Sequence, residues 1–592
     1  EQQQQQHQPT TSRLWHALDS RYAQPKSTYR LLVRTPNTAW TPSATSTSTS
    51  TSTSTPRQQR YLRSATLELL SGCVQSIVGQ KLAQTTYAAS LANLSYGVSL
   101  TPSGLCYSFS GYSDRLPSFA KFVVSSVGGM EVDRRVFEVV KDRKLRALQG
   151  VEKEPPQNQA FYYAGILLDR ALEVEECLEV VRSSTLEDVR GHLEGVLGGR
   201  GDVEAVCMGN VGEEEAKAWF EDTMGILEEN WANFELKSKS KSKSKSKWVP
   251  SSSILAFNSS TSPSDVSIHM QSTNPTDENG AVVAKMQSNL LSYTGPADGP
   301  DCLRRAAAIR VLNHMLREPL FDELRTKQTL GYIVTSALDV GYSGCNSMDQ
   351  DTGIGNVEGK ENYHCNKIDS IYIVIVSKKV SPVDITNRLF RFLAQFESTL
   401  ASSGEDVLSS HKIALRKKID EPHKNLSSEV GEVWPLIRRF APCAAASSSA
   451  PGGVNFDAMK DVSKAIGDVT KEDVLEAYRE VVAGPNARRV VSCVYGNRFT
   501  LEKSRGEKCM LGGRRLETVQ EIRRFAAGLP VVSKDNANGS YAPRGGFFLR
   551  RNIVGVVGVG IVVGVGVAVG LIFRNKKTPT TTHETLSSIR RS

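Results

Sequence analysis

The sequence lacks the short motifs that mark a self-contained catalytic site. Its 9 histidines are so widely spread that no two lie three to five residues apart, and neither H-E-x-x-H nor H-x-x-E-H occurs. No single helix can therefore offer two imidazoles to one zinc ion. A G-x-S-x-G elbow, a Walker loop and a strand-linked G-x-G-x-x-G are also absent. These absences predict that the chain is inactive by itself.

Paired cysteines and a basic folded surface are missing as well. The 10 cysteines are scattered without a C-x-x-C pair, which excludes a disulfide scaffold and a zinc finger. The net charge is +9, but six lysines alternate with serine from Lys237 to Lys247, and without them the charge is +3. A nucleic-acid binder carries Lys and Arg over a folded face. The composition therefore predicts no nucleic-acid partner.

One long uncharged run is present, from Ile553 to Phe573. Its 21 residues span about 30 Å as a helix, which is the thickness of the hydrocarbon core of a bilayer. Arg550 and Arg551 precede it, and Lys576 and Lys577 follow it. The run predicts a single-pass transmembrane helix and a membrane location, and the alternative is a buried core helix. Basic residues are balanced on its two sides, so its orientation and compartment stay open.

An internal repeat divides the rest of the chain. The segment Thr185-Leu-Glu-Asp-Val189 recurs as Thr470-Lys-Glu-Asp-Val474. Thr at the N-cap followed by acidic residues in the first turn is typical of a helix start. Each segment is followed by an apolar run that ends in Gly-Asn, at residues 203–210 and 490–497. The repeat predicts two copies of one α/β domain, joined by the Lys/Ser tract.

A third match links Leu94-Ser-Tyr96-Gly-Val98 to Leu330-Gly-Tyr332-Ile-Val334. The second copy then needs insertions, and the Gly-rich and Ser-rich segments 341–367 and 441–453 are predicted loops. Residues 213–230 have the apolar spacing of an amphipathic helix. Because helical and β-type runs come in separate blocks, the predicted fold class is α+β.

The candidate site lies in the segment from Glu318 to Val334. It has the pattern of a helix end, a turn at Gly331 and a strand that opens with Tyr332, and Arg325 precedes the turn. The two side chains can converge on one spot, where a fixed cation and a phenol can hold a peptide carbonyl or a developing oxyanion. The alternative is an ordinary surface Arg and a half-buried Tyr.

At this point several ordered segments resemble one family. They are similar to the C-terminal half of insulysin (insulin-degrading enzyme)-like zinc metallopeptidases of the pitrilysin superfamily, the inverted zincins, over roughly Leu14 to Asn497. The segments that carry the resemblance are Tyr87–Tyr96, Gly111–Pro117, Glu318–Val334, Arg416–Ser427 and Thr470–Val474.

The resemblance implies two homologous α/β-roll domains, each a largely antiparallel sheet packed by helices, and the uncharged run 553–573 adds the predicted transmembrane helix after them. The expected divisions are a Gln-rich tail (1–13), a third domain (14–236) with a Thr/Ser-rich insertion (41–56), a Lys/Ser linker (237–250), a fourth domain (251–530), the transmembrane helix (553–573) and a short tail (574–592).

It also implies a function. Arg325 and Tyr332 are expected to contact the substrate near the zinc, and Phe321 to line the same apolar pocket. The Zn²⁺ ligands are expected on the N-terminal half, outside this chain, so no metal ligands are assigned here. The expected partners are peptide substrates and that catalytic half, on the same chain or as a separate subunit. The implied activity is that of a zinc metalloendopeptidase, which the predicted transmembrane helix would anchor in a membrane, and the alternative is a non-catalytic, membrane-tethered peptide-binding subunit.

Overall fold

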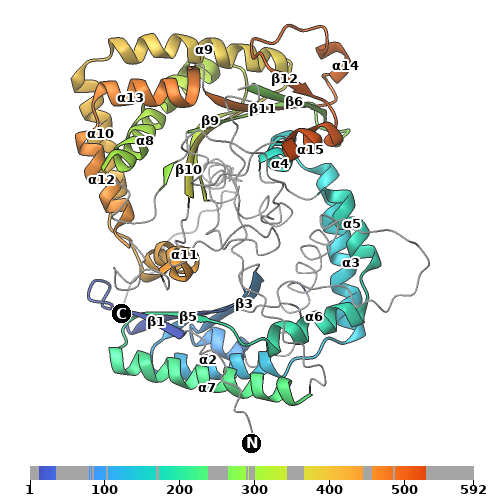
Figure 1. Cartoon of the computed structure of the whole chain (residues 1–592), viewed down its shortest axis with the longest axis vertical. Helices are drawn as coiled ribbons and strands as arrows, with labels where there is room; N and C mark the ends of the chain where they lie inside the picture. The colour runs from blue at the N-terminus through green and yellow to red at the C-terminus, as the bar shows by residue number, and fades with distance from the viewer. Residues whose placement is uncertain are drawn as a thin grey trace, which may run out of the picture.

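Two β-sheets lie at opposite ends of the molecule, and helices run between them along both sides (Figure 1). The computed structural model describes residues 12–34, 86–101, 104–168, 173–237, 265–288, 291–292, 300–342, 366–444, 456–484 and 487–528, together with positions 72, 76, 79 and 82.

Among the helices, α7 contains the predicted amphipathic segment 213–230. Their bounds are α2 Leu116–Gly128, α3 Arg134–Gly150, α4 Pro156–Leu168, α5 Val174–Ser183, α6 Leu186–Gly198, α7 Glu213–Lys237, α8 Pro300–Phe321, α9 Pro382–Ser402, α10 Glu405–Ile419, α11 Leu426–Ala444, α12 Ala458–Asp468, α13 Lys471–Tyr478, α14 Leu501–Ser504 and α15 Val519–Gly528. A 3₁₀ turn covers Val151–Lys153, and π-helical segments cover Asp322–Lys327 and Arg479–Ala483.

The two sheets repeat one strand order. The first runs β1 (Ser12–Leu18), β5 (Val203–Gly209), β2 (Lys26–Val33), β4 (Gly104–Tyr112) and β3 (Ser95–Thr101). The second runs β6 (Asp265–Gln271), β11 (Arg488–Tyr495), β7 (Gly280–Gln287), β10 (Asn366–Ser377) and β9 (Ile333–Tyr342), with β12 (Arg514–Leu516) and β8 (Leu291–Ser292) added. In each, the first pair is parallel and the next three are antiparallel.

The two helix starts predicted from the repeat are confirmed. The Thr185 hydroxyl accepts from the Asp188 N–H (3.2 Å), and the Asp188 carboxylate accepts from the Thr185 N–H (2.9 Å). Thr470 and Asp473 form the same box, at 3.2 and 2.7 Å. Each box satisfies backbone N–H groups that an α-helix leaves without an internal partner.

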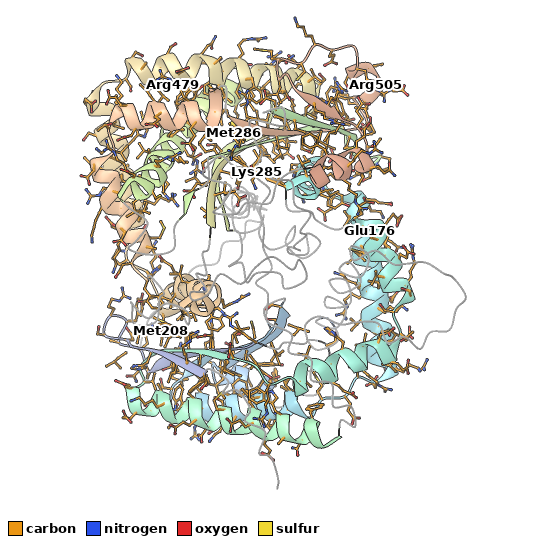
Figure 2. The ribbon with its side chains drawn as sticks, in the orientation of Figure 1. Glu176, Met208, Lys285, Met286, Arg479 and Arg505 are labelled. Carbon is orange, nitrogen blue, oxygen red and sulfur yellow. The ribbon has the colours of Figure 1, made fainter. Side chains whose placement is uncertain are left out.

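Each sheet is covered on one face by a helix from the other part of the chain. Leu167 of α4 packs with Val374 in the second sheet, and Trp434 of α11 packs with Leu32 in the first. Figure 2 shows Met208 of the first sheet close to α11. Burying a large apolar side chain contributes about 1.5–3 kcal/mol. These two exchanged helices therefore join the two sheets into one structure.

Ion pairs add to this connection on one side of the molecule. Arg523 of α15 pairs with Glu173 and with Glu176, which precede and lie in α5. Glu176 is labelled beside α5 in Figure 2. All three side chains are mostly buried, so the pairs are less screened by water than surface pairs are.

The predicted fold class is wrong as stated. The described residues form a mixed α/β fold with parallel as well as antiparallel strand pairs, and none of their helices is long and apolar enough to cross a membrane. For example, the 25-residue helix α7 is long enough to cross a bilayer, but it carries charged residues along its whole length. The run 553–573, on which the transmembrane prediction rested, lies outside the described residues.

Candidate functional site

The candidate site is the connection between α8 and β9. Pro319 lies in the last turn of α8, and the chain continues as the π-helical segment 322–327. A proline has no N–H to donate within a helix, and single π-turns are frequent at functional sites. Leu324 anchors the segment because its side chain is fully buried. The segment is therefore anchored to the core by Leu324, while its other side chains are partly or fully exposed to solvent.

Phe321 and Arg325 form one group on this turn. The Arg325 guanidinium carbon lies 4.7 Å from the centre of the Phe321 ring, and 41% of the Phe321 surface is exposed. The acidic neighbours Asp322 and Glu323 are engaged by Lys327, at 3.0 and 3.4 Å, and these contacts raise the pKa of Lys327. Arg325 forms no ion pair with any described residue, so its cation can receive a ligand's carbonyl or carboxylate.

The turn that follows is tightly constrained. A Cβ on Gly331 would lie 1.8 Å from the Val376 carbonyl oxygen, so only glycine fits against β10. Thr329 has a φ of 48°, which is an unusual conformation for a β-branched residue. The Ser377 hydroxyl donates to the Leu330 carbonyl and holds the turn to the end of β10. Backbone strain of this kind clusters at functional sites.

Tyr332 lies just beyond the turn, and 58% of its surface is exposed. Partial burial, together with the nearby Asp277 carboxylate, raises the pKa of its phenol. The hydroxyl is therefore protonated at neutral pH and can donate a hydrogen bond. Asp277 lies in the β6–β7 turn, where its side chain accepts from the Asn279 N–H (2.8 Å).

The β6–β7 turn is held by the other part of the chain. The Thr273 backbone N–H donates to the side-chain oxygen of Gln159 in α4 (3.1 Å). The side-chain amide of Asn274 donates to the Lys153 carbonyl (3.0 Å). The exchanged helix α4 thus supports the turn whose carboxylate acts on Tyr332.

The structure brings together only part of the predicted site. Arg325 and Phe321 are in contact, whereas Tyr332 makes no hydrogen bond with either of them. The close approach of Gly331 to β10 and the strain at Thr329 were not predicted. A glycine between Leu330 and Tyr332 was the one available signal for that approach, because glycine often marks a close backbone contact.

A zinc site is not formed by the described residues. No group of three or more His, Cys, Asp or Glu side chains within them is arranged to hold a metal ion. A zinc site needs at least three protein ligands when it is catalytic and four when it is structural. The described residues therefore do not supply the ligand set of a catalytic or a structural zinc site.

Comparison with known proteins identifies the family. Residues 4–180 match the middle or third domain of peptidase M16, and residues 185–359 match the peptidase M16 inactive domain. The chain has the middle and C-terminal domains of the peptidase M16 family. Residues 350–434 also match domain 4 of the C-terminal lobe of PqqF-like PQQ synthase. The resemblance to the C-terminal half of an insulysin-like protease is confirmed.

Curated relatives agree with this assignment. Human insulin-degrading enzyme is 24% identical over 468 residues, which cover 77% of this chain and 40% of the relative. The peroxisomal insulin-degrading enzyme-like 1 of Arabidopsis thaliana is 23% identical over 494 residues, with 83% and 43% covered. The M16 chain thus spans less than half the length of these relatives.

Solved structures show the same fold. Pitrilysin superposes with a TM-score of 0.63 at 16% identity, over 89% of this chain and 46% of that one. The periplasmic protease PqqL from Escherichia coli has a TM-score of 0.51 at 12% identity, over 80% and 43%. At these identities the likeness concerns the fold alone.

Proposed function

We propose that this M16 chain is the C-terminal half of a zinc metalloendopeptidase that degrades peptides, and that it forms the wall of the substrate chamber opposite the zinc site. The Zn²⁺ and its ligands belong to the N-terminal half, on the same chain or in a partner subunit. Membership of a peptidase family supports the reaction class.

The observation that carries the proposal is a set of three side chains at the α8–β9 connection, Phe321, Arg325 and Tyr332. Phe321 and Tyr332 are large side chains with 41% and 58% of their surfaces exposed, and Arg325 lies over Phe321. An extended peptide offers carbonyl oxygens and apolar side chains to such a group. Arg325 holds a peptide carbonyl, Phe321 covers an apolar side chain, and the Tyr332 hydroxyl donates where negative charge develops.

A second candidate function is a non-catalytic peptide-binding subunit. The description of the 185–359 match as an inactive domain favours it. Both functions use the same three side chains to hold a peptide. They differ in whether the Tyr332 hydroxyl affects turnover or only binding.

The test is a quenched fluorescent peptide assay with the full chain paired to an insulysin-like N-terminal half. Tyr332→Phe is expected to lower kcat about 100-fold, because removing one donor to a developing oxyanion costs about 3 kcal/mol. The matched control is Tyr96→Phe, since Tyr96 occupies the same position of the repeat and packs against Phe119. Tyr96→Phe should leave kcat unchanged.

Two results would decide against the catalytic proposal. Wild-type kcat in Tyr332→Phe, with peptide affinity also unchanged, would remove Tyr332 from the site. Wild-type kcat with weakened peptide affinity would favour the binding subunit. Melting curves of each variant separate both results from a loss of fold.

A further inference from the structure

Two histidines from different helices meet at the edge of the second core. His314 of α8 and His411 of α10 have their Nδ1 atoms 2.8 Å apart, and the rings are nearly perpendicular (77°) with centroids 5.1 Å apart. Both side chains are half-buried. One Nδ1 carries the hydrogen and the other accepts it, so the pair holds one proton between two metal-ligand atoms.

We propose that His314 and His411 form a two-imidazole site for a divalent transition metal ion of the Cu²⁺ or Ni²⁺ class. In tetrahedral zinc sites, taken as a geometric reference, imidazole nitrogens at about 2.0–2.1 Å from the ion lie about 3.4 Å apart. The observed 2.8 Å needs only a small opening of the pair, by side-chain rotation. The Nδ1 proton moves to Nε2 of the same ring, so that both imidazoles stay neutral and bind the ion through Nδ1, and water completes the coordination.

The charges around His314 affect how tightly a cation binds. Arg317 and Lys418 face His314 and disfavour a cation, whereas Glu318 attracts one. No third His, Cys, Asp or Glu ligand completes the site among the described residues. A site with two nitrogen ligands follows the general order of affinity for these ions, so Cu²⁺ is expected to bind most tightly.

The metal connects α10 to the helix that leads into the candidate site. His314 precedes Phe321 by seven residues, which is about 10 Å along α8. Arg325 follows directly in the π-helical segment. A bound ion therefore restrains α8 near the turn that carries Arg325. This consequence for peptide turnover rests on the proposed function, whereas metal binding itself does not.

The experiment is a Cu²⁺ titration of the full chain, monitored by calorimetry and by electron paramagnetic resonance. Wild type should show hyperfine coupling to two imidazole nitrogens. His314→Gln and His411→Gln should each raise the Kd for Cu²⁺ at least about tenfold, since the loss of even a residue that supports a ligand costs 10–100-fold. His423→Gln is the matched control, because His423 is half-buried but paired with Glu432 at 2.7 Å. It should bind Cu²⁺ as wild type does.

Unchanged affinity in both His314→Gln and His411→Gln would overturn the site, as would a two-nitrogen signal that persists in the double variant. Melting curves identify any variant that is misfolded, and His411→Leu provides a second variant that has no metal ligand at this position. Cu²⁺ should raise the Tm of wild type and leave the Tm of His411→Leu unchanged. All of these measurements are made without peptide, so they stand or fall independently of the peptidase proposal.

Discussion

The two parts of the M16 chain share one strand order but differ where a helix gives way to the strand at the sheet edge. In the first part this is the start of β3, and in the second it is the start of β9. Leu94 and Val98 are buried in the first part, and Leu330 and Val334 are buried in the second. These positions maintain the fold in both copies.

The residue between them behaves differently. Tyr96 packs edge-on against Phe119, with ring centroids 5.9 Å apart, and belongs to the border of the first core. Tyr332 has 58% of its surface exposed and belongs to no core cluster of the described residues. The repeat therefore keeps the buried positions in both copies, whereas its tyrosine is packed in the first copy and exposed in the second, where it can contact a ligand.

The largest expected effect on stability comes from the close approach of Gly331 to β10. Gly331→Ala should lower the free energy of unfolding by about 3 kcal/mol, because the new methyl group would meet the Val376 carbonyl oxygen and force the turn away from β10. Ser95→Ala, at the matching position of the first part, should change stability by less than about 0.5 kcal/mol because Ser95 is exposed. Urea unfolding measures both, and equal losses would show that the two turns are packed alike.

Low pH should destabilise the first part of the chain by favouring the protonation of His192 in the unfolded state. Burial lowers the pKa of His192 to about 4 from an ordinary 6.5. The unfolded chain then binds a proton that the folded chain does not, so stability falls as pH drops from about 6.5 to about 4. At about 1.4 kcal/mol per pKa unit, the loss is about 3 kcal/mol at pH 4.

His192→Leu should remove most of that loss and shift the acid unfolding midpoint to lower pH. His269 in the second part also has a lowered pKa, of about 3, so its stability loss should extend to more acidic pH. Circular dichroism during acid titration measures both midpoints. An unchanged midpoint in His192→Leu would mean that another group controls acid unfolding of the first part.

Arg325 tests whether the exposed group of the second part binds peptide. Arg325→Ala should lower kcat/KM about tenfold or more, since a hydrogen bond to a charged group is worth about 1.5–3 kcal/mol. Arg325→Lys should recover only part of the loss, because an ammonium lacks the planar fork of donors. The control is Arg505→Ala, which removes an exposed arginine that is paired with Glu517 and labelled in Figure 2. Equal kinetics for Arg325→Ala and Arg505→Ala would exclude Arg325 from the site.

The smallest expected effect lies at the two residues with positive φ before the edge strands. Asn93 has a φ of 57° and Thr329 a φ of 48°. Asn tolerates this conformation better than a β-branched residue does. Thr329→Asn should therefore stabilise the chain by about 1 kcal/mol, and Asn93→Thr should destabilise it by a similar amount. Differential scanning calorimetry gives both signs, and a destabilised Thr329→Asn would mean that the Thr329 contact with Lys379 outweighs the strain.

Local patterns account for the parts of the fold that could be predicted. The Thr185 and Thr470 helix starts, the helix of residues 213–230 and the position of the turn before Tyr332 all depend on residues a few positions apart. Capping and amphipathic spacing act over that range. The transmembrane prediction rested on residues 553–573, which lie outside the described residues, and none of the described helices is long and apolar enough to cross a membrane.

By itself, the sequence determined the repeat, the family and the residues available at the candidate site. The tertiary structure decided which of them meet. The exchange of α4 and α11, the approach of Asp277 to Tyr332 and the contact of His314 with His411 each join distant segments; the two histidines are 97 residues apart. Such pairings depend on how whole helices pack against sheets, and side-chain spacing within one segment carries no information about them.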